Sequence, residues 1–122
     1  MKEVLFVDDE RSVLVALERM LRPHRDRWNM TFVEGGVEAL AHLERRPVDV
    51  VVTDMRMPGM DGSALLEIVR ELHPDTVRIV LSGELEADGA VRIADLAHHR
   101  LHKPCDPAAI VGALEGACAK PN

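Results

Sequence analysis

The chain has 122 residues with a formal net charge of −6 and 47% hydrophobic residues, which fits one globular domain and argues against a nucleic-acid-binding surface. No apolar run approaches the roughly 18 residues of a membrane span, and the N-terminus does not have the pattern of a signal peptide. Two cysteines form no disulfide framework, so we expect a reduced, cytoplasmic protein that makes no contact with a membrane.

The first half of the chain predicts two strand–helix pairs. Residues 4–7 are a short, continuous apolar run, typical of a strand that is buried on both faces of a sheet. Apolar residues then recur at helical spacing over residues 13–21. A weaker strand is predicted over residues 30–33, and the next helix over residues 37–43, with Val37 on its apolar stripe.

The second half continues the alternation. Residues 48–53 and 77–81 predict two strands, separated by a helix whose apolar stripe runs from residue 65 to residue 72. A weaker stripe over residues 91–97 predicts a fourth helix. The fifth strand, residues 100–102, is placed mainly by its position in the order.

The last helix has the clearest starting point. Asp106 is a favourable N-cap residue and Pro107 suits the first helical position, so we expect a helix from Pro107 to about Ala119. Five strands alternating strictly with five helices predict an α/β fold with a parallel sheet covered on both faces. The whole chain, 1–122, is expected to be one domain with its core over about residues 2–119, with no output domain within it.

Polar residues follow the carboxyl ends of the predicted strands, where ligands bind in open parallel sheets. Asp8 and Asp9 follow the first strand, Asp54 the third, Ser82 the fourth and Lys103 the fifth. Three neighbouring carboxylates repel one another unless a cation joins them, and the lysine leaves two negative charges. Oxygen donors favour Mg²⁺ for this place, and the absence of sulfur and imidazole from the group disfavours zinc.

Such a group of residues suits phosphoryl transfer. A carboxylate can attack phosphorus and form an aspartyl phosphate, while cations stabilise the charge on the transferred oxygens. A small hydroxyl one strand away, that of Ser82, would hydrogen-bond the attached phosphoryl group. Because it would move only when that group is present, this hydroxyl is a candidate switch.

At this point the chain resembles a response-regulator receiver domain of two-component signalling, over essentially its whole length. The matching motifs are VDDE (7–10), TDMRMPGMDG (53–62), LSG (81–83) and HKP (102–104). They are weak singly and specific in combination. The resemblance implies a flavodoxin-like (βα)5 fold, a doubly wound parallel five-stranded sheet with strand order 2-1-3-4-5.

The resemblance also implies the roles of the acidic residues. Asp54 resembles the phosphoacceptor. Asp9 resembles a direct Mg²⁺ ligand, and Asp8 its partner that acts largely through water. The backbone carbonyl of Arg56 resembles a further metal ligand, and Arg56 together with Glu84 is expected at the mouth of the site, where the pair would slow loss of the phosphoryl group.

The switch residues follow from the same resemblance. Ser82 resembles the switch hydroxyl and Lys103 the phosphate-binding lysine, with a cis bond expected before Pro104. Arg100 departs from the family pattern, because an aromatic residue usually stands there and swings inward. Burying a guanidinium is costly unless it is paired, so we expect Arg100 to stay near solvent.

The function implied is a phosphorylation switch, with no activity of a metabolic enzyme. Asp54 would accept a phosphoryl group from a sensor histidine kinase or a phosphotransfer protein with Mg²⁺, and the domain would later dephosphorylate itself. The signal would pass through the Ser82 loop and the face built by the fourth helix, the fifth strand and the fifth helix. An output domain in a longer parent protein, a separate effector and a homodimer are left open.

Three other functions compete with this interpretation. A phosphohydrolase resembling the haloacid-dehalogenase type would need Asp-x-Asp, whereas Met55 and Arg56 follow Asp54. A flavin-binding module would need a phosphate cradle after the first strand, where this chain has acids, and would be helped by more aromatic residues. A receiver-like interaction domain that is never phosphorylated would have no need of the full acid set.

Other residues have simpler interpretations than a site. The histidines at 98–102 are expected to be exposed and not to bind metal, and the arginines between 22 and 27 to surround a solvated helix exit. Cys105 is expected to be a small buried thiol. Trp28 is expected to cover the edge of the second strand, and packing explains the methionines between 55 and 60 as well as a contact surface does.

Overall fold

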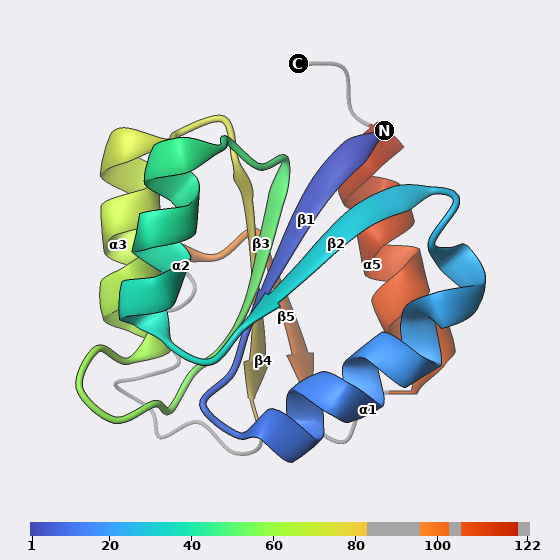
Figure 1. Ribbon diagram of the computed structural model, residues 1–122. Coiled ribbons are helices and arrows are strands. Elements are labelled where there is room, and N and C mark those ends of the chain that lie inside the picture. Colours follow the sequence, from blue (N-terminus) through green and yellow to red (C-terminus); the bar gives the residue numbers. More distant parts are fainter. Residues whose placement is uncertain (83–95, 103–105, 120–122) are drawn as a thin grey trace.

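A computed structural model of the chain describes residues 1–82, 96–102 and 106–119. Five strands form one parallel sheet in the order β2-β1-β3-β4-β5 (Figure 1). The strands are β1 (Lys2–Val7), β2 (Trp28–Val33), β3 (Val50–Asp54), β4 (Val77–Ser82) and β5 (His99–His102). The predicted fold class and strand order are confirmed.

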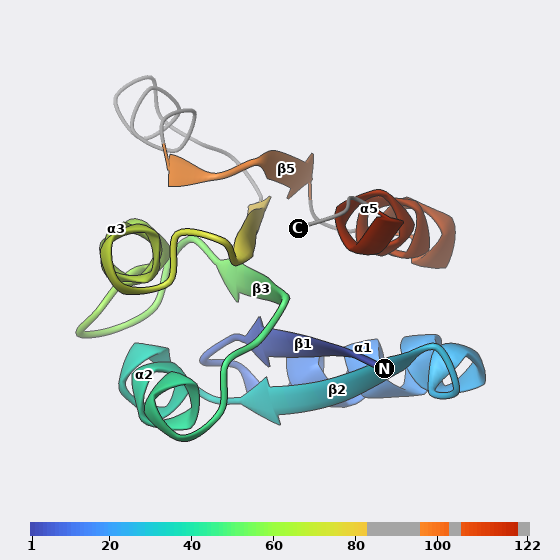
Figure 2. The ribbon, with the colours of Figure 1, turned by 90° about the horizontal axis from the view of Figure 1, so that it is seen from above.

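Helices cover both faces of the sheet, as the alternation predicts. The helices are α1 (Arg11–Leu21), the short 3-10 helix η1 (Arg22–His24), α2 (Gly36–Arg45), α3 (Gly62–Leu72) and α5 (Pro107–Ala119). Figure 2 shows α2 and α3 on one face and α1 and α5 on the other. The fourth helix predicted over residues 91–97 lies mostly outside the described residues.

Each face of the sheet has its own apolar core, which explains the continuous apolar runs. Along β1, Phe6 faces the cluster under α1 and α5, whereas Leu5 and Val7 face the cluster under α2 and α3. Trp28 is only 4% exposed and belongs to the first cluster. The expectation that it covers a strand edge is therefore wrong, because its indole ring turns into the core on the α1 side.

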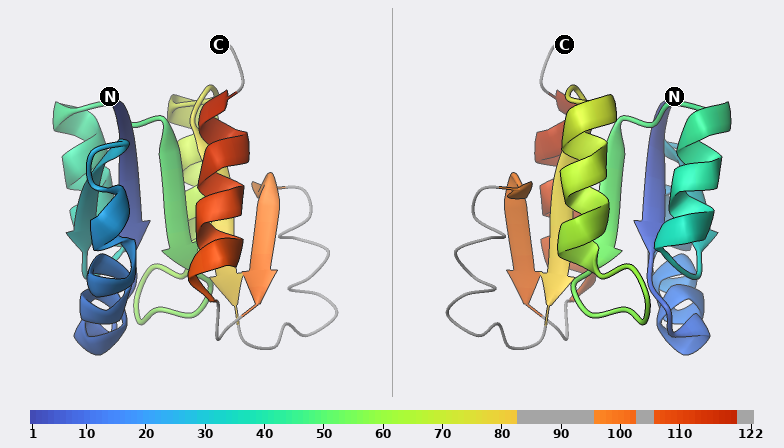
Figure 3. Two further views of the ribbon diagram at one scale, coloured as in Figure 1. Left: turned by 90° about the vertical axis from the view of Figure 1, so that its right-hand side faces the viewer. Right: turned by 90° about the vertical axis from the view of Figure 1, so that its left-hand side faces the viewer.

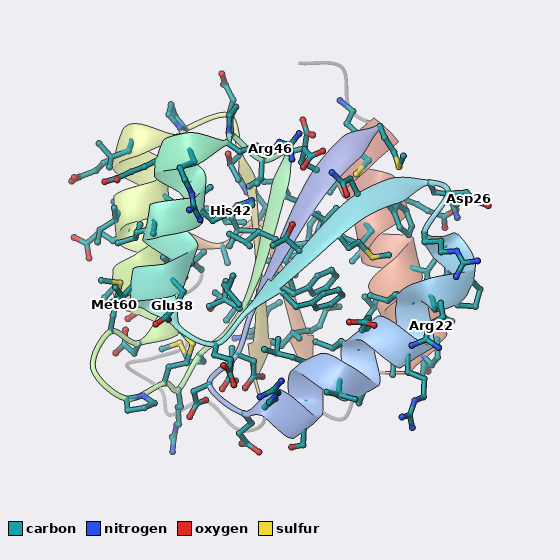
Figure 4. The ribbon with its side chains drawn as sticks, viewed as in Figure 1. Arg22, Asp26, Glu38, His42, Arg46 and Met60 are labelled. Atoms are coloured by element: carbon teal, nitrogen blue, oxygen red, sulfur yellow. The ribbon has the colours of Figure 1, made fainter. Side chains whose placement is uncertain are left out.

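The predicted apolar stripe of α2 is right in part: Leu43 is buried and Leu40 packs against the same cluster, but Val37 does not. Val37 is 69% exposed, while Gly36, Ala39 and Leu43 are the buried residues of this helix. A Cβ atom at Gly36 would lie 2.8 Å from the sulfur of Met60, which lies beside the first turn of α2 (Figure 4). The Met60 side chain therefore packs closely against Gly36, on the buried side of the helix.

The beginning of α5 is as predicted. The Asp106 carboxylate accepts a hydrogen bond from the Ala109 amide at 2.7 Å, so the N-cap is confirmed. Near the end of this helix, Cys118 is half-buried against the first cluster, and burial raises the pKa of its thiol. In the described parts of the chain, no helix has the length and apolar character needed to cross a membrane.

Candidate functional site

Three carboxylates meet at one edge of the sheet. β1 and β3 are adjacent, with Val7 aligned with Thr53, so the residues that end these strands lie side by side. Oxygen atoms of Asp8, Asp9 and Asp54 lie within 4.8 Å of one another. Asp8 and Asp54 are buried, with 1% and 7% exposure, and Asp9 is more accessible.

Two hydrogen bonds hold Asp8 in place, one made by its backbone and one by its side chain. Its backbone N–H donates to the Val33 carbonyl at 3.2 Å, which ties it to the end of β2. Its Oδ1 accepts from the Glu10 amide at 2.9 Å, just before α1 begins. Asp8 therefore makes a local turn contact just before α1 and also belongs to the acid cluster.

The loop after β3 is closed by its own backbone. The Gly62 amide donates to the Met55 carbonyl at 2.8 Å, and the Met55 amide donates to the Leu81 carbonyl at 3.2 Å. Gly59 has φ +78°, a left-handed conformation that favours glycine. Met57 is buried in the cluster under α2 and α3, which holds the loop against the fold and supports packing as the role of this side chain.

Gly62 begins α3 directly against the carboxyl end of β3. A Cβ atom there would lie 2.3 Å from the Asp54 carbonyl oxygen and 2.9 Å from Cα of Met55. We expect Gly62→Ala to destabilise the fold by about 1–3 kcal/mol, because backbone has to move. The same shift should weaken Mg²⁺ binding, and urea denaturation with calorimetric Mg²⁺ titration measures both effects.

Gly112→Ala is the matched control for this change. Gly112 lies inside α5, and in the described part of the chain a Cβ atom built there meets nothing within 4 Å beyond its own helix backbone and chain neighbours. The helix should gain about 0.5–1 kcal/mol from an alanine at such a position. If Gly62→Ala were as stable as the wild type, β3 and α3 could move apart at no cost in free energy of unfolding, which would contradict the prediction.

The remaining predicted residues divide into three groups. Ser82 ends β4 one strand away from Asp54, which is aligned with Leu81, and Ser82 is itself aligned with His102 of β5. Arg56 and Arg100 are exposed, the first in the loop after β3 and the second on β5. Outside the described residues lie Lys103, Glu84, Pro104 and Cys105.

Two of the arginines between residues 22 and 27 form ion pairs with glutamates. Arg22, at the end of α1 in Figure 4, lies 3.6 Å from Glu18, and Arg27 lies 2.8 Å from Glu115 of α5. Across residues 1–82, 96–102 and 106–119, the three aspartates are the only group of metal-ligating side chains, so no histidine there joins such a group. Arg22, Arg25 and Arg27 are all exposed, so the prediction that they are solvated is confirmed.

The donor set fits a hard divalent cation. All three candidate side-chain ligands are carboxylates, and two of them are buried, where like charges repel most strongly without a cation. Mg²⁺ prefers oxygen ligands of this kind and usually keeps several waters, for which the accessible Asp9 leaves room. Figure 3 shows that the strands of the sheet all end at this edge.

Comparisons with known proteins agree on one family. Its sequence profile, described as response regulator receiver domain, matches residues 4–115. The DNA-binding transcriptional regulator NtrC of Salmonella typhimurium is 40% identical over 88 residues, which are 72% of this chain and 18% of that protein. The hydrogenase transcriptional regulatory protein HoxA of Cupriavidus necator is 41% identical over 88 residues. The chain spans 18% of the length of both proteins.

Solved structures are similar over nearly the whole chain. The signal receiver domain of an HD domain-containing protein from Pseudomonas fluorescens has a TM-score of 0.90 and 29% identity, and covers 96% of this chain and 94% of that one. The chemotaxis protein CheY4 of Vibrio cholerae has a TM-score of 0.86 and 26% identity, covering 96% and 98%.

Proposed function

The chain belongs to the response regulator receiver domain family, which serves as a signalling switch in two-component systems, and on this premise we propose that Asp54 is its phosphoacceptor. One observation supports this assignment above all: the carboxylates of Asp8, Asp9 and Asp54 gather within 4.8 Å at the end of the sheet. Asp54 is the member that ends the central strand β3, beside the strand that carries Ser82.

Mg²⁺ is the metal that this family generally uses, and the donor set fits it. We propose that Asp9, Asp54 and the backbone carbonyl of Arg56 hold the ion, with Asp8 acting largely through water. When bound, Mg²⁺ supplies positive charge that offsets the charge of the phosphoryl oxygens. The hydrogen bond from the Glu10 amide keeps Asp8 oriented.

The proposed reaction is a phosphoryl transfer between side chains. An oxygen of Asp54 attacks phosphorus, the P–N bond of a phosphohistidine breaks, and the bonding electron pair returns to the imidazole of the donor. Ser82 would hydrogen-bond one phosphoryl oxygen, and the ammonium of Lys103 would pair with another. Attack by water on the aspartyl phosphate later resets the switch.

The donor would be a sensor histidine kinase or a phosphotransfer protein. The readout would be the Ser82 loop and the face that includes β5 and α5, acting on an output domain of a longer parent protein, on a separate effector or on a second copy. The lengths of NtrC and HoxA favour the first of these, since the chain spans 18% of each. The low cysteine content suits a cytoplasmic place of action.

Incubation with acetyl phosphate and Mg²⁺ tests this function. Mass spectrometry should find one phosphoryl adduct, stable in acid and labile in base, on the peptide that contains Asp54. Beryllium trifluoride with Mg²⁺ should mimic the phosphorylated state of the domain. Steady turnover of a generic phosphate ester would favour the phosphohydrolase, a coloured purified protein would favour the flavin module, and a wild type that takes no label would favour the unphosphorylated interaction domain.

Arg100 gives this switch a different residue at the usual aromatic position. Its side chain is exposed on β5, where it is aligned with Val80. We propose that it stays at the surface in both states while the Ser82 loop moves. A structure with beryllium trifluoride in which Arg100 is buried and unpaired would contradict this.

Arg56 and Glu84 are proposed to slow loss of the phosphoryl group by pairing across the entrance. Exposed pairs add only about 0–1 kcal/mol of stability, so the fold should be unaffected by replacing them. Each single variant, Arg56→Ala and Glu84→Ala, should dephosphorylate faster at fixed Mg²⁺, by up to about tenfold for 1.4 kcal/mol. The double variant should be no faster than the faster single one. Additive effects would leave two independent surface residues.

A further inference from the structure

Arg78 is a buried cation that the proposed reaction does not use. It lies near the start of β4 and is 7% exposed, between the apolar residues Val77 and Ile79. Its Nε donates to the Leu96 carbonyl at 2.7 Å, and its Nη1 donates to the Thr76 carbonyl at 3.2 Å. Burial, and then the charge of Arg70, lower the pKa of Arg78.

The main chain of Arg78 makes two further contacts with the same segment. Its backbone N–H donates to Nδ1 of His98 at 2.9 Å, and the His98 backbone N–H donates to the Arg78 carbonyl at 2.7 Å. Together with the bond to Leu96, this gives three hydrogen bonds between Arg78 and residues 96–98. Burying a guanidinium costs free energy unless its N–H donors are paired. A function for these hydrogen bonds would explain why the strand has an arginine at this position.

These contacts lie directly before the ladder between β4 and β5. The ladder aligns Ile79 with His99 at one end and Ser82 with His102 at the other. Figure 3 shows β5 at the edge of the sheet, and among the described strands it pairs only with β4. With four residues, HRLH, of which only Leu101 is apolar, the strand itself specifies its register weakly.

The register of β5 fixes which residue of the strand stands at the carboxyl end of the sheet. Lys103 follows His102 in the sequence, and Leu81, the neighbour of Asp54 on β4, is aligned with Leu101. A slip of one residue turns every side chain of a strand to the opposite face. Register therefore determines which residue follows β5 at the edge of the sheet where Asp54 lies.

We propose that Arg78 and His98 are positioning residues for phosphoryl transfer: they fix the register of β5 and thereby bring Lys103 to Asp54. This inference rests on the proposed function and adds to it a pair of residues far from the chemistry. Arg78 is aligned with Val51, three residues before Asp54 on β3. The effect of Arg78 and His98 passes through the ladder of β4 and β5.

Variants of His98 test the proposal. His98→Ala removes the Nδ1 acceptor, whereas His98→Asn places an amide oxygen near the same position. At saturating acetyl phosphate and Mg²⁺, we expect His98→Ala to be phosphorylated roughly tenfold more slowly, and His98→Asn to recover most of the rate. Calorimetric Mg²⁺ affinity should be unchanged in both, because the three carboxylates are intact.

His99→Ala is the matched control, since His99 is the next residue and both histidines are exposed. It should be phosphorylated at the wild-type rate. Arg78→Met keeps much of the side-chain volume and removes the donors. It should speed hydrogen exchange of the Leu101 and His102 amides roughly tenfold relative to those of β1. If Arg78→Met fails to fold, the His98 variants still decide the question.

The outcomes separate the two proposals. A wild type that is not phosphorylated on Asp54 overturns the proposed function. A phosphorylated wild type, together with His98→Ala at the wild-type rate and unchanged exchange in β5, overturns the positioning role alone. A loss of Mg²⁺ affinity in His98→Ala that accounts for its slower phosphorylation would also overturn it, because the damage would then reach the whole site.

Discussion

Asp54→Ala and Asp54→Asn are expected to take up no phosphoryl group from acetyl phosphate in the presence of Mg²⁺. The reason is chemical, because neither an amide nor a methyl group can form the acyl phosphate that a carboxylate forms. Unfolding is not expected to cause the loss. Asparagine keeps the shape of the side chain and reduces the charge of a cluster in which three carboxylates lie within 4.8 Å.

Intact-mass spectrometry after labelling measures this prediction, and thermal melting shows that the variants are folded. Asp75→Asn is the control, since Asp75 is an exposed acid between α3 and β4, at the opposite end of the strands. It should be labelled like the wild type. Normal labelling of Asp54→Ala at another residue would show that the phosphoacceptor is wrongly assigned.

Asp9→Asn is expected to weaken Mg²⁺ binding by at least about tenfold, or 1.4 kcal/mol, and to abolish labelling. Asp9 is the most accessible of the three acids, which suits a ligand that meets the partly hydrated ion. Removing its charge leaves two buried carboxylates to attract the cation. Calorimetric titration gives the affinity, and acetyl phosphate labelling gives the chemical consequence.

Glu10→Gln provides the matched control for Asp9→Asn. It makes the same change of charge at the next position, where the exposed side chain makes no capping hydrogen bond to α1. Its Mg²⁺ affinity should stay within about twofold of the wild type, because an exposed charge near the site is screened. EDTA should abolish labelling of the wild type. Undiminished labelling in EDTA or in Asp9→Asn would remove the metal from the mechanism.

The sequence by itself determined the elements and their order. Alternating strand-like runs and helical stripes are local patterns, and they located all five strands and the four α-helices that the structure describes, but not the short 3-10 helix η1. The acids at the ends of β1 and β3 could also be found, because parallel strands end at one edge whatever packs around them. The N-cap at Asp106 is similarly local, since its partner is three residues away.

Only the tertiary structure decided how these elements meet. Met60 packs against Gly36 at the start of α2, and Gly62 lies against the Asp54 carbonyl at the start of α3. The hydrogen bonds of Arg78 to Leu96 and His98 join residues that lie 18 and 20 positions apart in the sequence. The hydrophobic pattern indicates which residues are buried, but it does not indicate which residues they contact. Such contacts exist only once the sheet and its two helical layers have packed together.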